Sequence, residues 1–263
     1  MKGILLAGGL GTRLDPLTRV ASKQLLPVYN RPMIHYPLAT LMRAGIRSVL
    51  VISAIEAIDG YKRLLGDGSR WGMRIAYAVQ LAPAGIAEAL IIGRSFVGQD
   101  NVALILGDNI FDGPLPLGSA LHLTTAACIY TYPVANPHCY GVVELNERGE
   151  PVTIDEKPLW PRSNLAITGV YVYSPLACEI AAKLSPSARG ELEISDVNRE
   201  FMRRKVLRVR PLEGAWFDCG TFDDLLQAGN YVQAIEKRTS CPMVDLDAIA
   251  EQNGWIKKPT SPP

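Results

Sequence analysis

Hydrophobic runs that alternate with stretches of helical periodicity organise the first half of this 263-residue chain. Continuous apolar runs suit strands of a parallel sheet that is covered on both faces. We therefore predict buried strands at residues 2–7, 48–53, 75–80 and 102–106. Helices are predicted between them, and the first begins near Pro32 and ends at Gly45. The alternation predicts a doubly wound, mainly parallel α/β sheet with right-handed crossovers.

The second half of the chain has more mixed signals. Residues 140–145 and 152–154 flank a turn with Gly149, which predicts a β-hairpin. Residues 167–173 predict a further strand, and Ser174-Pro175 precedes a helix. Thr221 and Asp224 have the spacing of a capping box before a helix that extends to residue 238. No linker divides the chain into independent domains, so we expect one domain over residues 1–240 and a short C-terminal segment and tail over 241–263.

The composition narrows the class of protein. Hydrophobic residues make up 48% and charged residues 20%, and the net charge is +1. This balance predicts a globular protein with a substantial core and argues against a nucleic-acid-binding surface, which usually has a basic excess. No apolar stretch is long enough to span a membrane. Five cysteines without a CxxC pair indicate a reduced, cytoplasmic protein in which most cysteines are small buried hydrophobes.

Three glycines follow the first predicted strand. Gly8, Gly9 and Gly11 allow the backbone to approach a phosphate closely, and Arg13 adds a planar fork for phosphate oxygens. A dinucleotide fingerprint requires glycine at position 14, which is Leu14, and no Walker tripeptide occurs in the segment. The alternative interpretation is a purely structural glycine turn. Lys23, in the segment that follows, favours an anion-binding loop instead.

Asp108 follows the strand predicted at residues 102–106, at the same sheet edge as the glycine loop. Ligands of open α/β sheets bind outside the carboxyl ends of the strands. Asp108 is thus a candidate site residue, although an isolated aspartate is as often a turn former. The D-x-D motif of a glycosyltransferase is absent here, and Asp245 and Asp247, which have that spacing, fit a solvated helix start better.

The ordered set of motifs resembles the sugar nucleotidylyltransferases, most of all their dTTP-using branch. The resemblance covers residues 2 to about 238. The matching segments are Gly8-Gly9-Leu10-Gly11-Thr12-Arg13-Leu14, Lys23-Gln24-Leu25-Leu26-Pro27-Val28, Leu64-Leu65-Gly66-Asp67-Gly68, Leu106-Gly107-Asp108-Asn109, Tyr140-Gly141-Val142-Val143-Glu144, Glu156-Lys157-Pro158, Arg189-Gly190-Glu191-Leu192-Glu193-Ile194 and Trp216-Phe217-Asp218-Cys219-Gly220-Thr221.

The resemblance implies a GT-A/Rossmann-like sheet with a nucleotide-binding half (1–110) and a sugar-binding half (111–240) that contains the hairpin. It implies that dTTP or UTP reacts with glucose-1-phosphate, giving a nucleotide sugar such as dTDP-glucose and pyrophosphate. Asp108 and Asp218 are expected to hold Mg²⁺, while Arg13 and Lys23 contact the phosphates. The family also implies a homo-oligomer, either a dimer or a tetramer.

Further roles follow from the same resemblance. The nucleotide-binding residues are expected to be Gly8, Gly9, Gly11, Thr12, Arg13, Gln24, Gln80 and Gly85. The residues that bind the sugar phosphate are expected to be Asn109, Gly141, Glu156, Lys157 and Ile167. Ordinary alternatives exist for some of these, since Gln80 could face water and Ile167 could belong to the core.

The chain departs from the dTTP-using pattern at several positions. Ala84 replaces an aspartate and Glu88 a glutamine beside the expected base-binding turn, which leaves dTTP and UTP both open. Cys219 replaces a threonine, and the family's C-terminal helices after Trp255 are not present. A uridylyltransferase and a weakened nucleotide-sugar-binding paralogue are the alternatives. Retention of both the basic residues and the two aspartates favours an enzyme.

Overall fold

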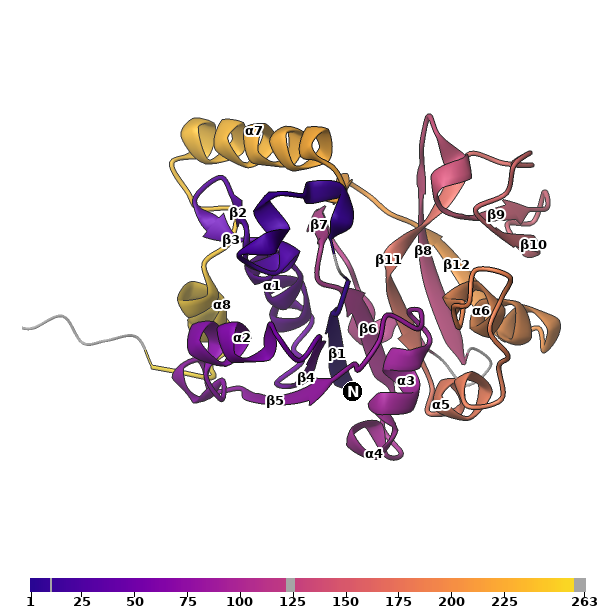
Figure 1. Cartoon of the computed structure of the whole chain (residues 1–263), viewed down its shortest axis with the longest axis horizontal. Helices are drawn as coiled ribbons and strands as arrows, with labels where there is room; N and C mark the ends of the chain where they lie inside the picture. Colours follow the sequence, from indigo (N-terminus) through magenta and orange to yellow (C-terminus); the bar gives the residue numbers. More distant parts are fainter. Residues whose placement is uncertain (10, 122–125, 258–263) are drawn as a thin grey trace, which may run out of the picture.

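A nine-stranded sheet forms the centre of the computed structural model, which describes residues 1–9, 11–121 and 126–257 (Figure 1). Its strands are β1 (Lys2–Ala7), β4 (Ser48–Ser53), β5 (Arg74–Val79), β6 (Val102–Leu106), β8 (Ala127–Pro133), β9 (Gly141–Leu145), β10 (Pro151–Glu156), β11 (Leu165–Tyr173) and β12 (Leu207–Pro211). Their order is β10-β9-β11-β6-β1-β4-β5, and β8 lies between β11 and β12.

The nucleotide-binding half of the sheet is parallel. In the register of the central strands, Leu5 of β1 faces Val51 of β4 on one side and Ile105 of β6 on the other. The chain adds β4 and β5 on one side of β1 and then returns to add β6 on the other side. A topological switch point therefore lies at the carboxyl ends of β1 and β6. The predicted α/β fold is therefore confirmed, with β5 beginning one residue earlier than expected.

The other half of the sheet is largely antiparallel. β11 runs antiparallel to both β6 and β8, and β9 and β10 form the predicted hairpin. β8 and β12, which pair in parallel, were not predicted. The sheet therefore contains more antiparallel pairs than the hydrophobic runs alone suggest, because β11 runs opposite to β6 and β8.

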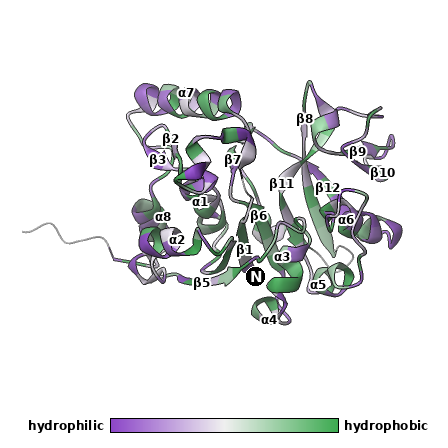
Figure 2. Cartoon of the chain, in the orientation of Figure 1, coloured by the Kyte–Doolittle hydropathy of each residue, from purple (hydrophilic) through white to green (hydrophobic). Residues whose placement is uncertain are grey.

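Helices cover both faces of the sheet, and strand residues alternate between two hydrophobic clusters. Along β1, Leu5 faces one cluster, whereas Ile4 and Leu6 face the other. The first face is covered by α1 (His35–Arg43), α2 (Ile58–Leu65), α7 (Phe222–Thr239) and α8 (Leu246–Gln252). The second is covered by α3 (Glu88–Ile92), α4 (Arg94–Val97), α5 (Leu176–Ala181) and α6 (Ile194–Arg203). Figure 2 shows the sheet as mainly hydrophobic between these layers.

Helix boundaries depend on local hydrogen bonds. The predicted helix start near Pro32 is wrong, because Pro32 belongs to β3 (Arg31–Pro32), which pairs with β2 (Pro27–Val28), and α1 begins at His35. At α7 the predicted capping box is present: the Asp224 N–H donates to Thr221 Oγ1 at 3.2 Å and the Thr221 N–H donates to Asp224 Oδ2 at 3.0 Å. Residues 258–263 of the predicted tail lie outside the described residues.

A small two-stranded ladder joins distant parts of the chain beside the switch point. β7 (Asn109–Asp112) pairs with β13 (Ala215–Asp218), which places Asp218 opposite Asn109. The Cys219 N–H also donates to the Asp108 carbonyl at 3.0 Å. The backbone therefore sets Asp108 and Asp218 side by side.

Candidate active site

The glycine loop leaves β1 at the switch point. Gly11 has φ of 64°, which favours glycine, and a Cβ there would lie 2.8 Å from the Thr18 methyl carbon. A Cβ on Gly8 would lie 2.2 Å from Gln80 Oε1, whereas one on Gly9 would meet nothing within 4 Å. Gly11 is thus required by the conformation of the loop, Gly8 leaves room for the Gln80 side chain, and Gly9 presents open backbone.

Arg13 extends from the end of this loop toward Asp218. A Cβ on Gly220 would lie 2.7 Å from a terminal nitrogen of Arg13, so the glycine leaves room for the guanidinium. The Arg13 side chain is exposed and, together with Thr12, lines a cavity. The structure thus brings the basic end of the glycine loop to the two aspartates.

Lys23, Asp108 and Asp218 form a charged cluster under the loop. Lys23 is 7% exposed, and its Nζ makes a close ion pair with Asp108 Oδ2. Burial, the largest single effect, would lower the pKa of Lys23, but the charge and hydrogen bond of Asp108 together with the charge of Asp218 outweigh it, so that pKa is raised. Burial, and then the negative charge of Asp108, raise the pKa of Asp218 well above its ordinary value. Two adjacent carboxylates, of which only Asp108 pairs directly with Lys23, favour further positive charge at this place.

Asn109 connects the two aspartates through its side-chain amide. The Nδ2 group donates to Asp108 Oδ1 at 2.9 Å and more weakly to Asp218 Oδ1 at 3.5 Å. Its Oδ1 accepts from Trp216 Nε1 at 2.7 Å and from the Gly169 N–H at 3.0 Å. The residue is 1% exposed, so its amide is committed to these partners. Trp216 and Gly169 are contributors that sequence reasoning missed.

A cavity of about 740 Å³ opens between the two halves of the molecule beside this cluster. Half of the predicted site residues line it: Thr12, Arg13, Asn109, Gly141, Glu156, Lys157, Ile167 and Asp218. The other predicted residues lie outside its lining: Gly8, Gly9, Gly11, Lys23, Gln24, Gln80, Gly85 and Asp108. The cavity is therefore built mainly by the expected sugar-binding residues and the end of the glycine loop.

The expected sugar-binding residues converge although they come from different strands. A Cβ on Gly141 of β9 would lie 3.2 Å from Glu156 Oε2 of β10 and 3.8 Å from Ile167 Cδ1 of β11. Glu156 Oε2 accepts from Ser195 Oγ at 2.5 Å, which holds the carboxylate at the cavity wall. The arrangement presents a carboxylate that can accept hydrogen bonds from sugar hydroxyls.

Arg189 is a third contributor that sequence reasoning missed, although it lies in one of the matching motifs. Its guanidinium is 3.4 Å from Glu156 Oε1, 3.0 Å from Glu191 Oε1 and 3.4 Å from Glu193 Oε1. Like the exposed Lys157, it lines the cavity. The signal available in the sequence was an arginine followed closely by two glutamates, Glu191 and Glu193. In the folded chain the arginine also lies beside the half-buried Glu156. Both cations can face an anionic ligand.

The expected base-binding residues form a separate cluster at the end of β5. Gly85 has φ of 106°, and a Cβ there would lie 2.4 Å from the Leu192 carbonyl oxygen. The Leu192 N–H donates to the Ala84 carbonyl at 2.7 Å, and the Ala87 N–H donates to the Leu192 carbonyl at 3.1 Å. The turn that contains Gly85 is thus tied to the segment that carries Arg189.

Gln24 lies in the interior instead of on the cavity. It is 2% exposed, and its Oε1 accepts from Ser22 Oγ at 2.9 Å and from the Tyr61 hydroxyl at 3.1 Å. These bonds hold the segment around Lys23 in place. A direct contact of the Gln24 side chain with nucleotide stays a prediction.

The donor set suits a magnesium ion. In residues 1–9, 11–121 and 126–257, no group of three or more His, Cys, Asp or Glu side chains could enclose a metal. The candidate is therefore the pair Asp108 and Asp218, whose mutual repulsion favours a cation. Mg²⁺ binds through one or two carboxylates and completes its shell with water and substrate phosphates. The residues present fit that coordination.

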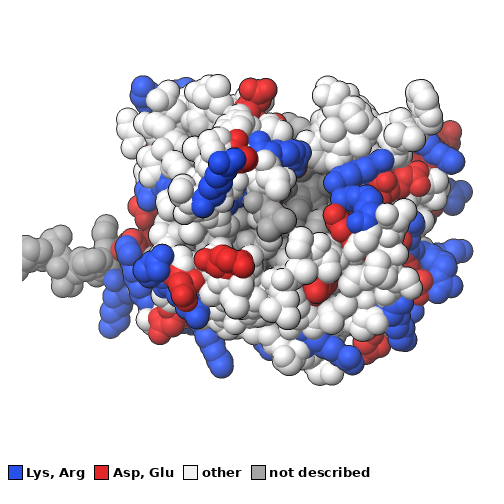
Figure 3. All heavy atoms as spheres, viewed as in Figure 1, with Lys and Arg blue, Asp and Glu red and all other residues white. Residues whose placement is uncertain are grey.

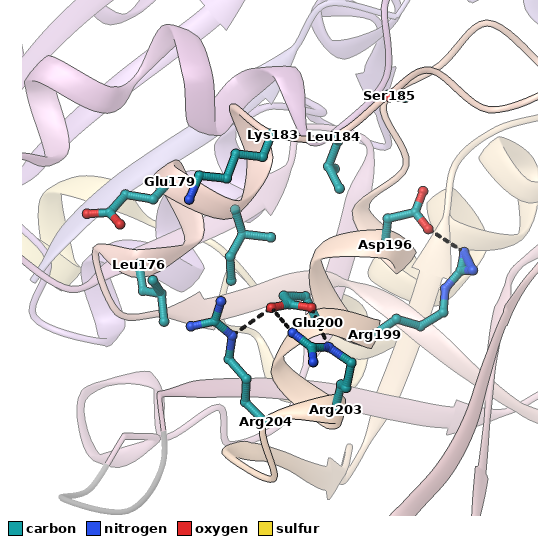
Figure 4. A pocket seen from close by; sticks show the side chains of 11 residues that line it. Leu176, Glu179, Lys183, Leu184, Ser185, Asp196, Arg199, Glu200, Arg203 and Arg204 are labelled. Atoms are coloured by element: carbon teal, nitrogen blue, oxygen red, sulfur yellow. Dashed lines mark hydrogen bonds and ion pairs between the residues drawn. The ribbon is translucent and has the colours of Figure 1, made fainter.

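A second cavity, of about 670 Å³, lies between α5 and α6 and shares no lining residue with the first (Figure 4). Its charges are largely paired, since Glu200 accepts from Arg203 and Arg204, and Asp196 pairs with Arg199. Asp245, the other acidic candidate, caps α8 by accepting from the Ala248 N–H at 3.0 Å. This confirms the helix-start interpretation of the late D-x-D pair.

Acidic and basic side chains are intermixed over the face shown in Figure 3.

Cys128, Cys178 and Cys219 are buried, as predicted for most cysteines, while Cys139 and Cys241 are exposed. Among the helices of the described residues, none has the length and hydropathy to cross a membrane.

A glycine loop and two adjacent aspartates beside a cavity, at the switch point of an α/β sheet, are the arrangement expected of a nucleotide-dependent transferase. Residues 2–235 match the nucleotidyl transferase family. The chain belongs to that family.

Relatives extend over nearly the whole chain. A glucose-1-phosphate thymidylyltransferase of Neisseria meningitidis is 52% identical over 97% of this chain and 91% of its own length. A glucose-1-phosphate thymidylyltransferase of Mycobacterium tuberculosis is 48% identical over 97% and 90%.

Solved structures agree with the fold. A Bacillus anthracis structure described as a glucose-1-phosphate thymidylyltransferase in complex with sucrose has a TM-score of 0.84 and 38% identity, covering 88% of this chain and 94% of that one. A UDP-glucose pyrophosphorylase complexed with UDP-glucose has a TM-score of 0.78 and 26% identity, covering 90% and 98%.

Proposed function

We propose that this nucleotidyl transferase joins dTTP to α-D-glucose-1-phosphate and releases dTDP-glucose and pyrophosphate. The observation that carries the proposal is that the end of the glycine loop (Thr12 and Arg13), Asp218 of the aspartate pair and Glu156 line one cavity. Relatives with that activity match 97% of the chain. Neither the glycine loop nor the aspartate pair would be needed by a protein that only binds sugars.

The reaction is a direct displacement. A phosphate oxygen of the sugar phosphate attacks the α-phosphorus of dTTP, and the bond from that phosphorus to the bridging oxygen of pyrophosphate breaks. Such chemistry depends on positioning and charge stabilisation, so no side chain has to act as a nucleophile.

Each charged residue has a distinct task. The glycine loop and Arg13 hold the triphosphate and the departing pyrophosphate, and Lys23 fixes Asp108 while adding positive charge nearby. Lys157 and Arg189 hold the sugar phosphate against repulsion by the nucleotide. Asp108 and Asp218 would hold Mg²⁺, which neutralises charge at the reacting phosphates. Asn109 keeps these two carboxylates in register.

Glu156 and Gly141 recognise the sugar. The Glu156 carboxylate is fixed by Ser195 and accepts hydrogen bonds from hydroxyl groups, while Gly141 leaves space beside it. Ile167 supplies an apolar contact to the sugar ring. On the nucleotide side, Gln80 and Gly85 contact the base. A cytoplasmic location and a homo-oligomeric state, either dimer or tetramer, are further parts of the proposal.

Pyrophosphate release tests the function. Purified protein is incubated with dTTP or UTP, with and without glucose-1-phosphate, in Mg²⁺ and in EDTA. We expect release only with both substrates and Mg²⁺, and faster release with dTTP than with UTP. Faster release with UTP would make the protein a uridylyltransferase. No release with either nucleotide would leave a nucleotide-sugar-binding protein.

A further inference from the structure

Trp216 and Asn109 lie on one face of the β7–β13 ladder. In the register of this pair, Asp218 lies directly opposite Asn109, so their side chains point to the same face. Side chains two residues apart along a strand also share a face, which places Trp216 on the face of Asp218. The indole of Trp216 therefore reaches Asn109 diagonally across the ladder, and its Nε1 group donates to Asn109 Oδ1 at 2.7 Å.

Two donors hold the Asn109 amide by its oxygen. Besides Trp216 Nε1, the Gly169 N–H donates to Oδ1 at 3.0 Å. The Nδ2 group then points the other way, where it donates to Asp108 Oδ1 at 2.9 Å and to Asp218 Oδ1 at 3.5 Å. A reversed amide would set its oxygen against two carboxylates and its nitrogen against two N–H donors, so all four bonds would be lost. Water cannot readily replace them, because Asn109 is 1% exposed.

The indole of Trp216 is itself fixed by aromatic neighbours. Its ring packs edge-on against Tyr132, with centroids 5.9 Å apart, and at a tilt against Tyr140, with centroids 5.3 Å apart. Tyr132 lies on β8, and Tyr140 directly precedes β9. Aromatic pairs have preferred geometries, and these two hold the ring without using its N–H group. Trp216 and Tyr140 also line the cavity, so the indole connects the cavity wall to the aspartate pair.

We propose that Trp216 is a positioning residue for the divalent cation, which acts through the Asn109 amide to hold the Asp108 and Asp218 carboxylates ready for a metal ion before substrates arrive. This inference rests on the proposed function and concerns the same site. The two carboxylates repel each other, and a donor shared between them offsets part of that repulsion. The amide uses one oxygen of each carboxylate, so lone pairs remain for a cation.

Binding of Mn²⁺ alone, measured from the paramagnetic resonance signal of the free ion, tests the proposal without substrates. Trp216→Phe keeps an aromatic ring beside the two tyrosines but removes the N–H donor. Loss of a group that orients metal ligands typically lowers metal affinity 10–100-fold, so we expect the Mn²⁺ dissociation constant to rise about tenfold or more.

Trp71→Phe is the matched control. Trp71 Nε1 also donates to a carboxylate, Asp247 Oδ1 at 3.0 Å, and neither residue lines the cavity. The control therefore loses the same kind of hydrogen bond at a distant place. Thermal unfolding should show comparable losses of stability in Trp71→Phe and Trp216→Phe, whereas only Trp216→Phe should bind Mn²⁺ more weakly.

A double-mutant cycle shows whether the effect passes through Asn109. Asn109→Ala should itself weaken Mn²⁺ binding, and Trp216→Phe should add little in that background, because residues that act through one group are not additive. Gly169→Ala disturbs the same amide from its other donor, since a Cβ there would lie 2.4 Å from Asn109 Oδ1. It should also raise the Mn²⁺ dissociation constant, and it decides the question if Trp216→Phe does not fold.

The metal measurement is independent of the reaction. Weaker Mn²⁺ binding in Trp216→Phe supports the inference even if the native protein releases no pyrophosphate and the proposed function fails. An unchanged dissociation constant in Trp216→Phe or in Gly169→Ala would overturn it. Full additivity of Trp216→Phe and Asn109→Ala would also overturn it, as would a native protein that binds no Mn²⁺, because the carboxylates would then not be held ready for a cation.

Discussion

The two halves of the molecule build their parts of the active site in different ways. The nucleotide half uses a short segment, the glycine loop and Arg13, which directly follows one strand of a parallel sheet. The sugar half draws Gly141, Glu156 and Ser195 from three separate elements that meet only in the folded chain. Backbone conformation thus determines the first site, whereas side-chain contact between distant elements determines the second.

This difference indicates which substitutions should act on which property. In the nucleotide half Lys23 and Asp108 are largely buried and paired, so a change at either should affect the fold as well as the reaction. In the sugar half the groups line an open cavity, so a change should affect one substrate. Asp218 lies where the halves meet and should show the largest effect.

Asp218→Asn should remove most of the activity. The variant retains the shape of the side chain but loses one of two carboxylates that would hold Mg²⁺. We expect kcat to fall on the order of 10²–10³-fold, as when a main electrostatic group is lost, and the Mg²⁺ concentration for half-maximal rate to rise. Pyrophosphate release against Mg²⁺ concentration measures both. Asp223→Asn, on the same cavity but in the first turn of α7, is the control and should stay within a fewfold of native.

Lys23→Met and Lys157→Met compare the two halves with one chemical change. Lys23 is buried against Asp108, and removal of one partner of a buried pair costs about 3 kcal/mol of unfolding free energy. Lys157 is exposed, so its loss should change stability by less than about 0.5 kcal/mol. Instead, the KM for glucose-1-phosphate should rise in Lys157→Met. Urea unfolding and initial rates test the pair, and equal stability losses in both variants would contradict the distinction.

Gly141→Ala should affect the sugar selectively. The added methyl group would lie 3.0 Å from Ser195 Oγ and 3.2 Å from Glu156 Oε2, so the carboxylate must shift. Small misplacements of positioning groups are costly, and we expect the KM for glucose-1-phosphate to rise about tenfold. The KM for dTTP should remain native. A rise in both KM values would show that the two sites are not separable in this way.

Thr221→Ala should have the smallest effect. Its hydroxyl caps α7, and loss of a helix cap typically costs about 1 kcal/mol. The KM values should remain close to native, since the Thr221 hydroxyl is engaged by Asp224. Thermal unfolding measures the loss, and Thr221→Ser, which keeps the hydroxyl, should restore most of the stability.

The parallel strands of the nucleotide half could be predicted from the sequence, because β1, β4 and β6 are continuous apolar runs between glycine-containing turns. The edge strand β12 was not predicted. Its alternation of arginine with apolar residues is the period-two pattern of a strand, but its place in the sheet depends on pairing with β8. The first helix was misplaced for a different reason, since Pro32 lies in the local β2–β3 hairpin, where it pairs with Pro27. Long-range pairing decided only the case of β12.

The candidate site residues also divide into those that local sequence indicates and those that depend on contacts in the folded chain. Residues of the glycine loop and Asp108 could be inferred from the strands that precede them. The pairing of Asp218 with Asp108 depends on the β7–β13 ladder, which no local pattern indicates, so it came only from the family resemblance. Asn109 was expected to contact sugar, but its amide is occupied by the aspartates, Trp216 and Gly169. Hydrogen-bond partners of this kind are determined by three-dimensional packing.

The direct measurement of the central claim, one displacement at a site shared by the two halves, follows the oxygen atoms of the sugar phosphate. Glucose-1-phosphate with isotopically labelled phosphate oxygens is converted with unlabelled dTTP and Mg²⁺, and the products are separated by mass. We expect all of the label in dTDP-glucose and none in pyrophosphate, with one pyrophosphate formed for each nucleotide sugar. Label in pyrophosphate, or pyrophosphate formed without sugar phosphate, would contradict the account.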